Sequence, residues 1–154
     1  MKRIFILLII CDLFFCSMNA QIHFHANVAN NHLWRGMEVA DGMVFTSDIS
    51  ITDKNEYFRI GLWGGTNTSG TYKEFNHYVS FTYRQLNLSV WDTYNFSPGA
   101  TYNNKEYFNY SAHSTGRFID ATLSYRFGKQ FPLFVAWSTI LFGRDRNTSN
   151  TANK

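Results

Sequence analysis

Apolar and polar residues alternate with a period of two along most of this chain. Six segments show the pattern, at residues 22–29, 45–52, 57–63, 74–83, 86–93 and 119–127. Successive side chains of a β-strand point to opposite faces, so each segment predicts a strand with one apolar and one polar face. A seventh segment, 133–142, is apolar on both faces apart from Ser138 and Thr139, so it predicts a strand without assigning its orientation.

The alternation also assigns side chains to faces. The apolar set contains Phe45, Ile49, Ile60, Leu62, Val79, Phe81, Leu88, Ile119 and Leu123. The polar faces carry five charged residues, Asp48, Arg59, Glu74, Asp120 and Arg126. His77 and Asp92 break the pattern, because both fall on the apolar face of their segments. We expect either that these two lie near lipid headgroups or that a β-bulge shifts the register there.

The predicted connections alternate between short and long. Residues 53–56, 84–85 and 128–131 are tight turns, whereas 36–42, 66–73, 95–116 and the residues after 143 are longer and rich in Asn, Gly, Ser and Thr. Short periplasmic turns and longer external loops are typical of bacterial outer-membrane β-barrels. Aromatic residues near the short turns would suit a membrane interface, and they are Tyr57, Phe58, Tyr83, Tyr125 and Phe127.

The N-terminus has the features of a cleavable signal peptide. Lys2 and Arg3 precede an apolar run, and a small residue, Ala20, ends the segment, so we predict residues 1–20 as the signal peptide. Both cysteines lie in it, which leaves the mature chain without a disulfide or a thiolate metal site. Acylation of Cys16 is the alternative, but Phe15 is too large for a lipobox. No later segment is apolar for long enough to form a membrane helix.

Composition agrees with strands and polar loops. Aromatic residues make up 18% of the chain and there are only two prolines. The formal net charge of +3 is small and scattered, which argues against nucleic-acid binding. The sequence therefore predicts an all-β domain at 21–154, an antiparallel up-and-down meander of about seven strands. Because bacterial single-chain barrels have an even number of strands, we expect an incomplete transmembrane β-barrel, truncated at its C-terminus.

Three motifs support this interpretation. They are His32-Leu33-Trp34-Arg35-Gly36-Met37, Gly61-Leu62-Trp63-Gly64 and Phe118-Ile119-Asp120-Ala121. Together they resemble an uncharacterised family of bacterial outer-membrane β-barrels found in Bacteroidota and proteobacterial sequences, over about residues 21–145. The resemblance implies the fold and the location but no enzyme chemistry. The family's usual chain continues with further strands, whereas this sequence stops in a polar stretch.

Few residues suggest chemistry. We expect Asp48, Arg59, Glu74, Asp120 and Arg126 to form a polar network in the barrel lumen, with a selectivity filter or a solute site as the alternative. Trp34 and Arg35 are expected to anchor the barrel mouth, or alternatively to contact a ligand there. His23 and His25 point the same way and are weak metal candidates that lack a third ligand. Nothing orients His113 on Ser114, so we assign no catalytic residue, no enzyme activity and no cofactor.

These observations predict an outer-membrane β-barrel protein of unknown cargo with a structural or pore and transport role. Its expected partners are outer-membrane lipid and the barrel-assembly machinery. We expect no nucleic-acid partner, and the sequence does not fix the oligomeric state. The alternative is a soluble periplasmic or secreted lipocalin-like ligand-binding β-barrel, for which Gly61-Leu62-Trp63 is a weak signature. In that case the apolar set would face inward and the charges would face solvent.

Overall fold

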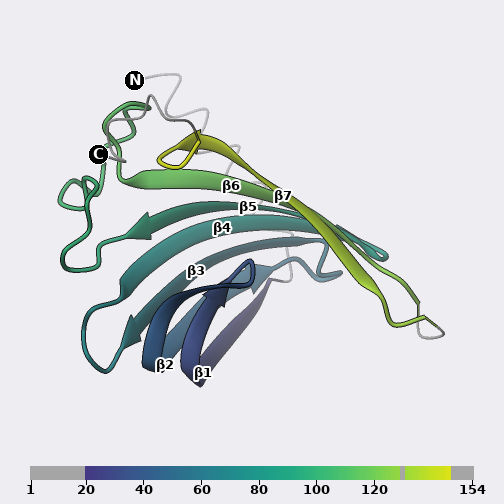
Figure 1. Cartoon of the computed structure of the whole chain (residues 1–154). Coiled ribbons are helices and arrows are strands. Elements are labelled where there is room, and N and C mark those ends of the chain that lie inside the picture. The colour runs from purple at the N-terminus through teal and green to yellow at the C-terminus, as the bar shows by residue number, and fades with distance from the viewer. Residues whose placement is uncertain (1–19, 129–130, 147–154) are drawn as a thin grey trace.

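The computed structural model describes residues 20–128 and 131–146, so the expected signal peptide lies outside the described residues except for Ala20. Seven β-strands make up the fold (Figure 1). They are β1 (Gln21–Trp34), β2 (Met37–Thr52), β3 (Phe58–Asn67), β4 (Lys73–Tyr83), β5 (Leu86–Asn95), β6 (Arg117–Arg126) and β7 (Phe134–Gly143). In the part of the chain that is described, no helix is long and apolar enough to span a membrane.

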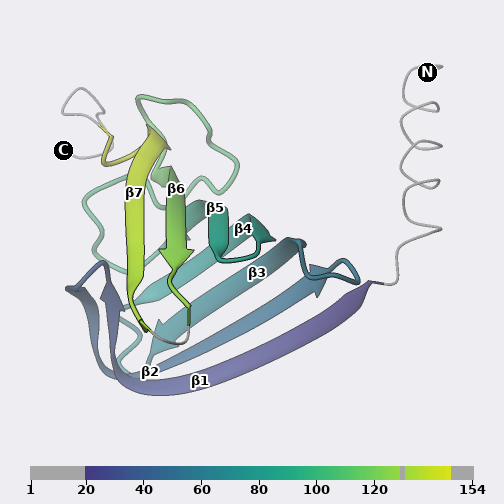
Figure 2. The same ribbon diagram turned by 90° about the vertical axis from the view of Figure 1, so that its right-hand side faces the viewer.

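The strands form one curved sheet in chain order. Each strand pairs antiparallel with the next, from β1 to β7, which confirms the predicted all-β meander (Figures 1 and 2). The sheet is open, because β1 and β7 are its two edges and neither pairs with a second strand among the described residues. The expectation of an unclosed sheet is therefore confirmed at the level of strand pairing.

Most strand positions agree with the alternation, but the first hairpin does not. The sequence predicted a long loop at 36–42, and this is wrong because β2 already begins at Met37. The connection is a two-residue turn in which Arg35 and Gly36 have φ angles of 52° and 81°. Two successive positive φ angles are those of a type I′ turn, whose twist matches that of the flanking strands. The long loop predicted at 95–116 is present at 96–116, between β5 and β6.

The end of this hairpin bends toward the opposite side of the sheet. Register shifts interrupt its ladder between Ala29 and Asn31 and between His32 and Leu33, and Gly42 has a φ of 70°. Bulges of this kind bend a strand and increase its twist. As a result, the turn end of β1 and β2 rises beside β6 and β7 (Figure 2).

The two faces of the sheet differ in polarity. On the convex face, one row across neighbouring strands runs through Ile22, Ile51, Ile60, Val79 and Val90. Ile60 is 67% exposed. On the concave face Ser50 is 1% exposed, although its strand neighbours Ile49 and Ile51 are exposed on the other side. Among the described residues, six hydrophobic side chains are buried, compared with ten polar or charged ones.

The structure also settles two points that the alternation left open. β7 turns Trp137 outward, opposite Leu123, and Ser138 inward, opposite Thr122. His77 faces Asp92 within a regular stretch of the β4–β5 ladder, so the β-bulge explanation for these two residues is wrong. Both lie on the convex face, where residues of the 96–116 loop contact them.

Candidate functional site: a chamber on the concave face

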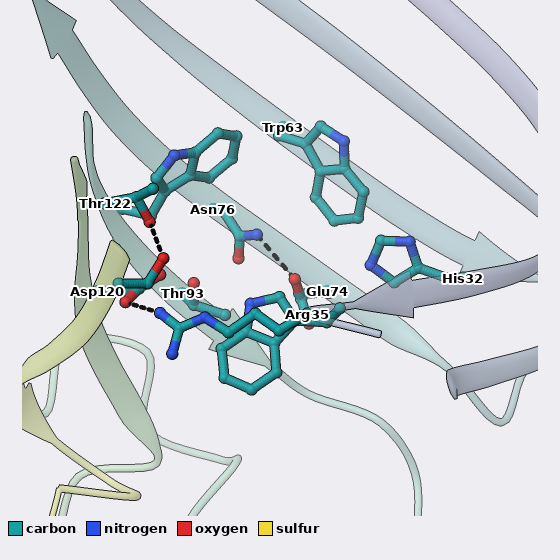
Figure 3. Close-up of a pocket in the computed structure, with 11 residues that line it drawn as sticks. His32, Arg35, Trp63, Glu74, Asn76, Thr93, Asp120 and Thr122 are labelled. Atoms are coloured by element: carbon teal, nitrogen blue, oxygen red, sulfur yellow. Dashed lines mark hydrogen bonds and ion pairs between the residues drawn. The ribbon is translucent and has the colours of Figure 1, made fainter. Parts of the chain in front are cut away.

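A chamber of about 320 Å³ lies between the curved sheet and the bent end of the first hairpin (Figure 3). Its walls come from every strand except β2, together with the hairpin turn. The lining residues are His32, Trp34, Arg35, Trp63, Glu74, Asn76, Trp91, Thr93, Asp120, Thr122 and Ser138. They are mostly inward-facing residues of successive strands, so the curvature of the sheet turns them toward one space.

An ion pair across the interior closes one side of the chamber. Arg35, at the hairpin turn, donates from Nη2 to Oδ1 of Asp120 on β6 (Figure 3). The side chain of Asp120 is 9% exposed and that of Arg35 is 32% exposed. Beside this pair, the ring of Trp34 meets the edge of Phe118 at 5.7 Å between centroids. These two contacts join the turn end of the first hairpin to β6, although β1 and β6 are far apart in strand order.

Three indole rings form much of the apolar wall. Trp91 stacks on Tyr78 at 4.3 Å between ring centroids and 17° between ring planes. Trp63 stacks on His32 at 5.4 Å. The guanidinium of Arg35 lies 4.5 Å from the ring centroid of Trp34. Each indole is thus held by a neighbour and lines the chamber with the rest of its surface.

The polar part of the wall is internally hydrogen-bonded. Glu74 accepts from Asn76 Nδ2 at 2.8 Å and from Asn95 Nδ2 at 3.3 Å. The hydroxyls of Thr122 and Ser138 lie 2.7 Å apart, with either able to donate. Because the amides of Asn76 and Asn95 already donate to the Glu74 carboxylate, the charge of that carboxylate is partly compensated by the chain itself.

A second lobe of about 300 Å³ adjoins the first and shares His32, Trp34, Glu74 and Thr93 with it. Arg144 lines this lobe, and its guanidinium lies 3.8 Å from the ring centroid of Tyr102 in the 96–116 loop. Burial raises the pKa of Tyr102, while the nearby Arg144 charge acts in the opposite direction. The phenol is therefore neutral at pH 7.

The predicted lumen network is only partly gathered here. Glu74 and Asp120 line the chamber, whereas Asp48, Arg59 and Arg126 lie elsewhere on the concave side. Arg59 donates to Ser50 Oγ at 2.9 Å, and Arg126 lies over the Phe134 ring at 5.4 Å. Within the described residues, no salt bridge joins two members of this set. The partner of Asp120 is instead Arg35.

The weak metal candidates are placed on the inner side of the edge strand β1. Nε2 of His23 lies 3.0 Å from Thr52 Oγ1, and His25 faces Asp48 across the β1–β2 ladder. In the described ranges, no three His, Cys, Asp or Glu side chains come close enough to hold a metal ion.

A second Arg–Asp pair lies on the convex face under the 96–116 loop. Arg117 donates to both carboxylate oxygens of Asp92, from Nε at 2.8 Å and from Nη2 at 2.9 Å. Its Nη1 donates to the carbonyl oxygen of Tyr107 at 2.6 Å. The hydroxyl of Tyr110 donates to Asp92, and that of Tyr107 lies 3.0 Å from His77 Nε2. This cluster fixes the loop to the sheet.

Of these chamber residues, Trp34 and Arg35 were predicted as candidate contacts from the sequence, whereas Trp63 and Trp91 were not. A signal was present, because both indoles fall on the polar faces of their strands, where bulky aromatic rings are unexpected. The ion pair had no comparable signal, because its partners lie 85 positions apart.

Comparison with other proteins adds no assignment: no protein-family model, curated protein or solved structure matches this chain.

Proposed function

We propose that this chain is a bacterial outer-membrane β-barrel protein with a structural or pore and transport role, as its resemblance to an uncharacterised barrel family suggests. One observation carries the proposal. Large apolar side chains are exposed on the convex face, while polar side chains such as Ser50, Asn76 and Asp120 are buried on the concave face. A β-sheet with this polarity suits lipid outside and a polar interior.

Strand length and row composition support the same proposal. Strands β3 to β7 have 10 or 11 residues, close to the length of a tilted strand that crosses a bilayer. A second convex row, Phe58, Phe81, Leu88 and Leu123, continues the apolar band next to the first. The lipocalin-like alternative needs the opposite arrangement of the two faces, with the apolar residues packed inside the barrel and the polar residues outside.

Aromatic residues gather at the short-turn end of the band. Tyr57 contacts Tyr83 at 6.0 Å between ring centroids, and Tyr125 contacts Phe127 at 4.9 Å. All four rings are exposed. Amphipathic rings of this kind favour the level of the lipid headgroups, so this end suits the periplasmic interface. The partners we propose are outer-membrane lipid and the barrel-assembly machinery. In lipid, the free edges of β1 and β7 would also need strand partners.

Adjacent residues on β4 provide a direct test. Val79 points outward and Ser80 inward, and both cysteines of the chain lie within residues 1–20, so a single cysteine at either position would be unique in the mature protein. The full chain would be expressed in a Gram-negative host and its membranes fractionated. We expect Ser80→Cys to react with a small water-soluble maleimide and Val79→Cys to be protected from it, because lipid excludes the reagent and keeps the thiol protonated. We also expect outer-membrane fractionation and heat-modifiable gel migration.

The soluble alternative gives the opposite results. The protein would then appear in the periplasmic or secreted fraction, and its gel migration would not change with heating. A water-soluble maleimide would also react with cysteine at position 79, because water would cover the convex face.

A further inference from the structure

We propose that the concave chamber is a binding site for a neutral saccharide of about disaccharide size. The inference concerns the interior of the sheet, so it goes beyond the membrane proposal and does not depend on what covers the convex face. Three of the four tryptophans in the chain, Trp34, Trp63 and Trp91, line one cavity, while the fourth, Trp137, is 66% exposed on the outside.

The chamber wall combines aromatic rings with short polar side chains. Indole rings offer broad apolar faces on which the C–H face of a sugar ring can stack, and a single tryptophan buries a large contact area. Interleaved with these rings are the hydroxyls of Thr93, Thr122 and Ser138, which keep hydrogen-bonding capacity for a ligand. The amide of Asn76 also lines the wall, but it is already bonded to Glu74 and to the backbone N–H of Tyr94. A ligand that matches both features presents an apolar ring face and several hydroxyl groups at its rim. Saccharides have this combination.

The charged side chains of the first lobe are compensated within the chain. Both carboxylates of the chamber already accept hydrogen bonds from the chain, Glu74 from two asparagine amides and Asp120 from Arg35. The Arg35 charge is in turn compensated by Asp120. An anionic ligand would therefore meet no uncompensated cation in this lobe, and a cationic ligand would have to compete for carboxylates that already have donors. The first lobe therefore favours a ligand without net charge. In the second lobe, Arg144 is paired with Asp145 at 2.9 Å, and its Nη1 has no hydrogen-bond partner among the described residues.

The volume of the chamber sets the size of the ligand. The two lobes, of about 320 and 300 Å³, share His32, Trp34, Glu74 and Thr93, so they lie side by side. Each volume lies at the small end of the range for ligand sites. One sugar ring per lobe accounts for this form, with Trp34 between the two rings.

The tryptophan distribution provides the test. The full chain, folded in detergent micelles or in buffer according to how it fractionates, would carry Trp137→Phe, so that all tryptophan emission comes from the chamber. Maltose, cellobiose and lactose are the probes, and choline and acetate are the charged controls. We expect at least one disaccharide to change the emission saturably, with neither control doing so.

Variants then locate the binding. Trp63→Ala should weaken the affinity about tenfold, or about 1.4 kcal/mol, whereas Trp137→Ala, the same change on the outer surface, should leave it unchanged. If Trp63→Ala does not fold, Thr122→Val removes one hydroxyl at nearly constant volume and should weaken binding several-fold. The proposal is overturned if none of the three disaccharides changes the tryptophan emission, or if choline or acetate changes the emission saturably. It is also overturned if Trp137→Ala weakens disaccharide binding as much as Trp63→Ala does. The membrane proposal survives each of these results, because its test reads out location and labelling.

Discussion

Two Arg–Asp pairs, on opposite faces of the same sheet, are built very differently. On the convex face, Arg117 is 0% exposed, and the rings of Tyr94, Tyr107 and Tyr110 lie within 5.0 Å of its guanidinium carbon. Its three donor nitrogens all have acceptors, at Asp92 and at the Tyr107 carbonyl. On the concave face, Arg35 has one carboxylate contact, stays partly exposed and borders a cavity.

The comparison distinguishes an anchor from a site. The buried Arg117 guanidinium is closed off from solvent, and each of its three nitrogens donates to the chain, so the Arg117 cluster acts as a structural anchor for the 96–116 loop. A partly exposed guanidinium beside open space can rearrange at a smaller cost. The same two residue types therefore serve packing on one face and leave room for binding on the other.

Breaking the convex anchor should give the largest effect. Arg117→Met keeps much of the side-chain length but leaves the Asp92 carboxylate without its main partner. Removing one member of a buried ion pair typically costs about 3–5 kcal/mol of unfolding free energy. Urea unfolding of the folded protein measures this, and Arg117→Lys, which retains the charge but loses the bidentate geometry, should cost less. A loss below about 1 kcal/mol for Arg117→Met would show that the cluster behaves like an exposed surface pair.

On the part of the convex face that the 96–116 loop does not cover, the cost of introducing a charged side chain should depend on its depth in the bilayer. Ile60 lies in the middle of the apolar band, and Leu86 lies beside the two-residue turn at 84–85. In a bilayer, an arginine costs about 2–4 kcal/mol at the midplane and about 0–1 near the interface. We therefore expect Ile60→Arg to destabilise the lipid-folded protein by more than Leu86→Arg does, as measured by denaturant unfolding in vesicles. Equal, small losses would indicate a face in contact with water.

The concave pair should contribute less stability than the convex one. Arg35→Gln removes the charged donor to Asp120 and leaves a shorter, neutral polar side chain in its place. Hydrogen bonds to charged groups contribute about 1.5–3 kcal/mol, and the partial exposure of Arg35 places the expected loss at about 1–2 kcal/mol. Arg126→Gln is the matched control, because Arg126 has no salt bridge among the described residues. Tryptophan emission should change for Arg35→Gln and not for Arg126→Gln. A loss as large as that of Arg117→Met would remove the distinction between the two pairs.

The fold was largely predictable because strand alternation is a local property. Each predicted segment overlaps an observed strand, and residues such as Ile60 and Arg59 face the sides that the pattern assigned. The hairpin at 34–37 was not predictable in the same way. Its bend depends on two bulges and on a contact between Arg35 and Asp120, and neither leaves a periodic signal in the sequence.

The two residues that break the alternation, His77 and Asp92, carry information about where the 96–116 loop lies. His77 and Asp92 are polar, lie on the apolar face and face each other across the β4–β5 ladder. Such a pair needs a polar cover, and the 96–116 loop supplies one through Tyr107, Tyr110 and the neighbouring Arg117. Polar residues at facing positions of an apolar face, next to a long tyrosine-rich loop, therefore predict that the loop folds over them.

The smallest expected effect is a pH response within the loop that the convex anchor holds. Glu106 Oε2 accepts from Asn103 Nδ2 at 2.7 Å and from Asn109 Nδ2 at 2.9 Å. These side-chain hydrogen bonds, that from Asn103 first, lower the pKa of Glu106 from its usual value of 4.5. A depressed folded pKa stabilises the loop above the unfolded value, and the stabilisation is lost as the pH falls through the folded pKa. Carboxyl NMR titration should place the Glu106 midpoint below 4.5, and amide exchange in the loop should accelerate over the same pH range. Glu106→Gln should abolish that acceleration, because an amide does not titrate. A midpoint at or above the usual value would mean that the two asparagines do not hold the carboxylate in solution.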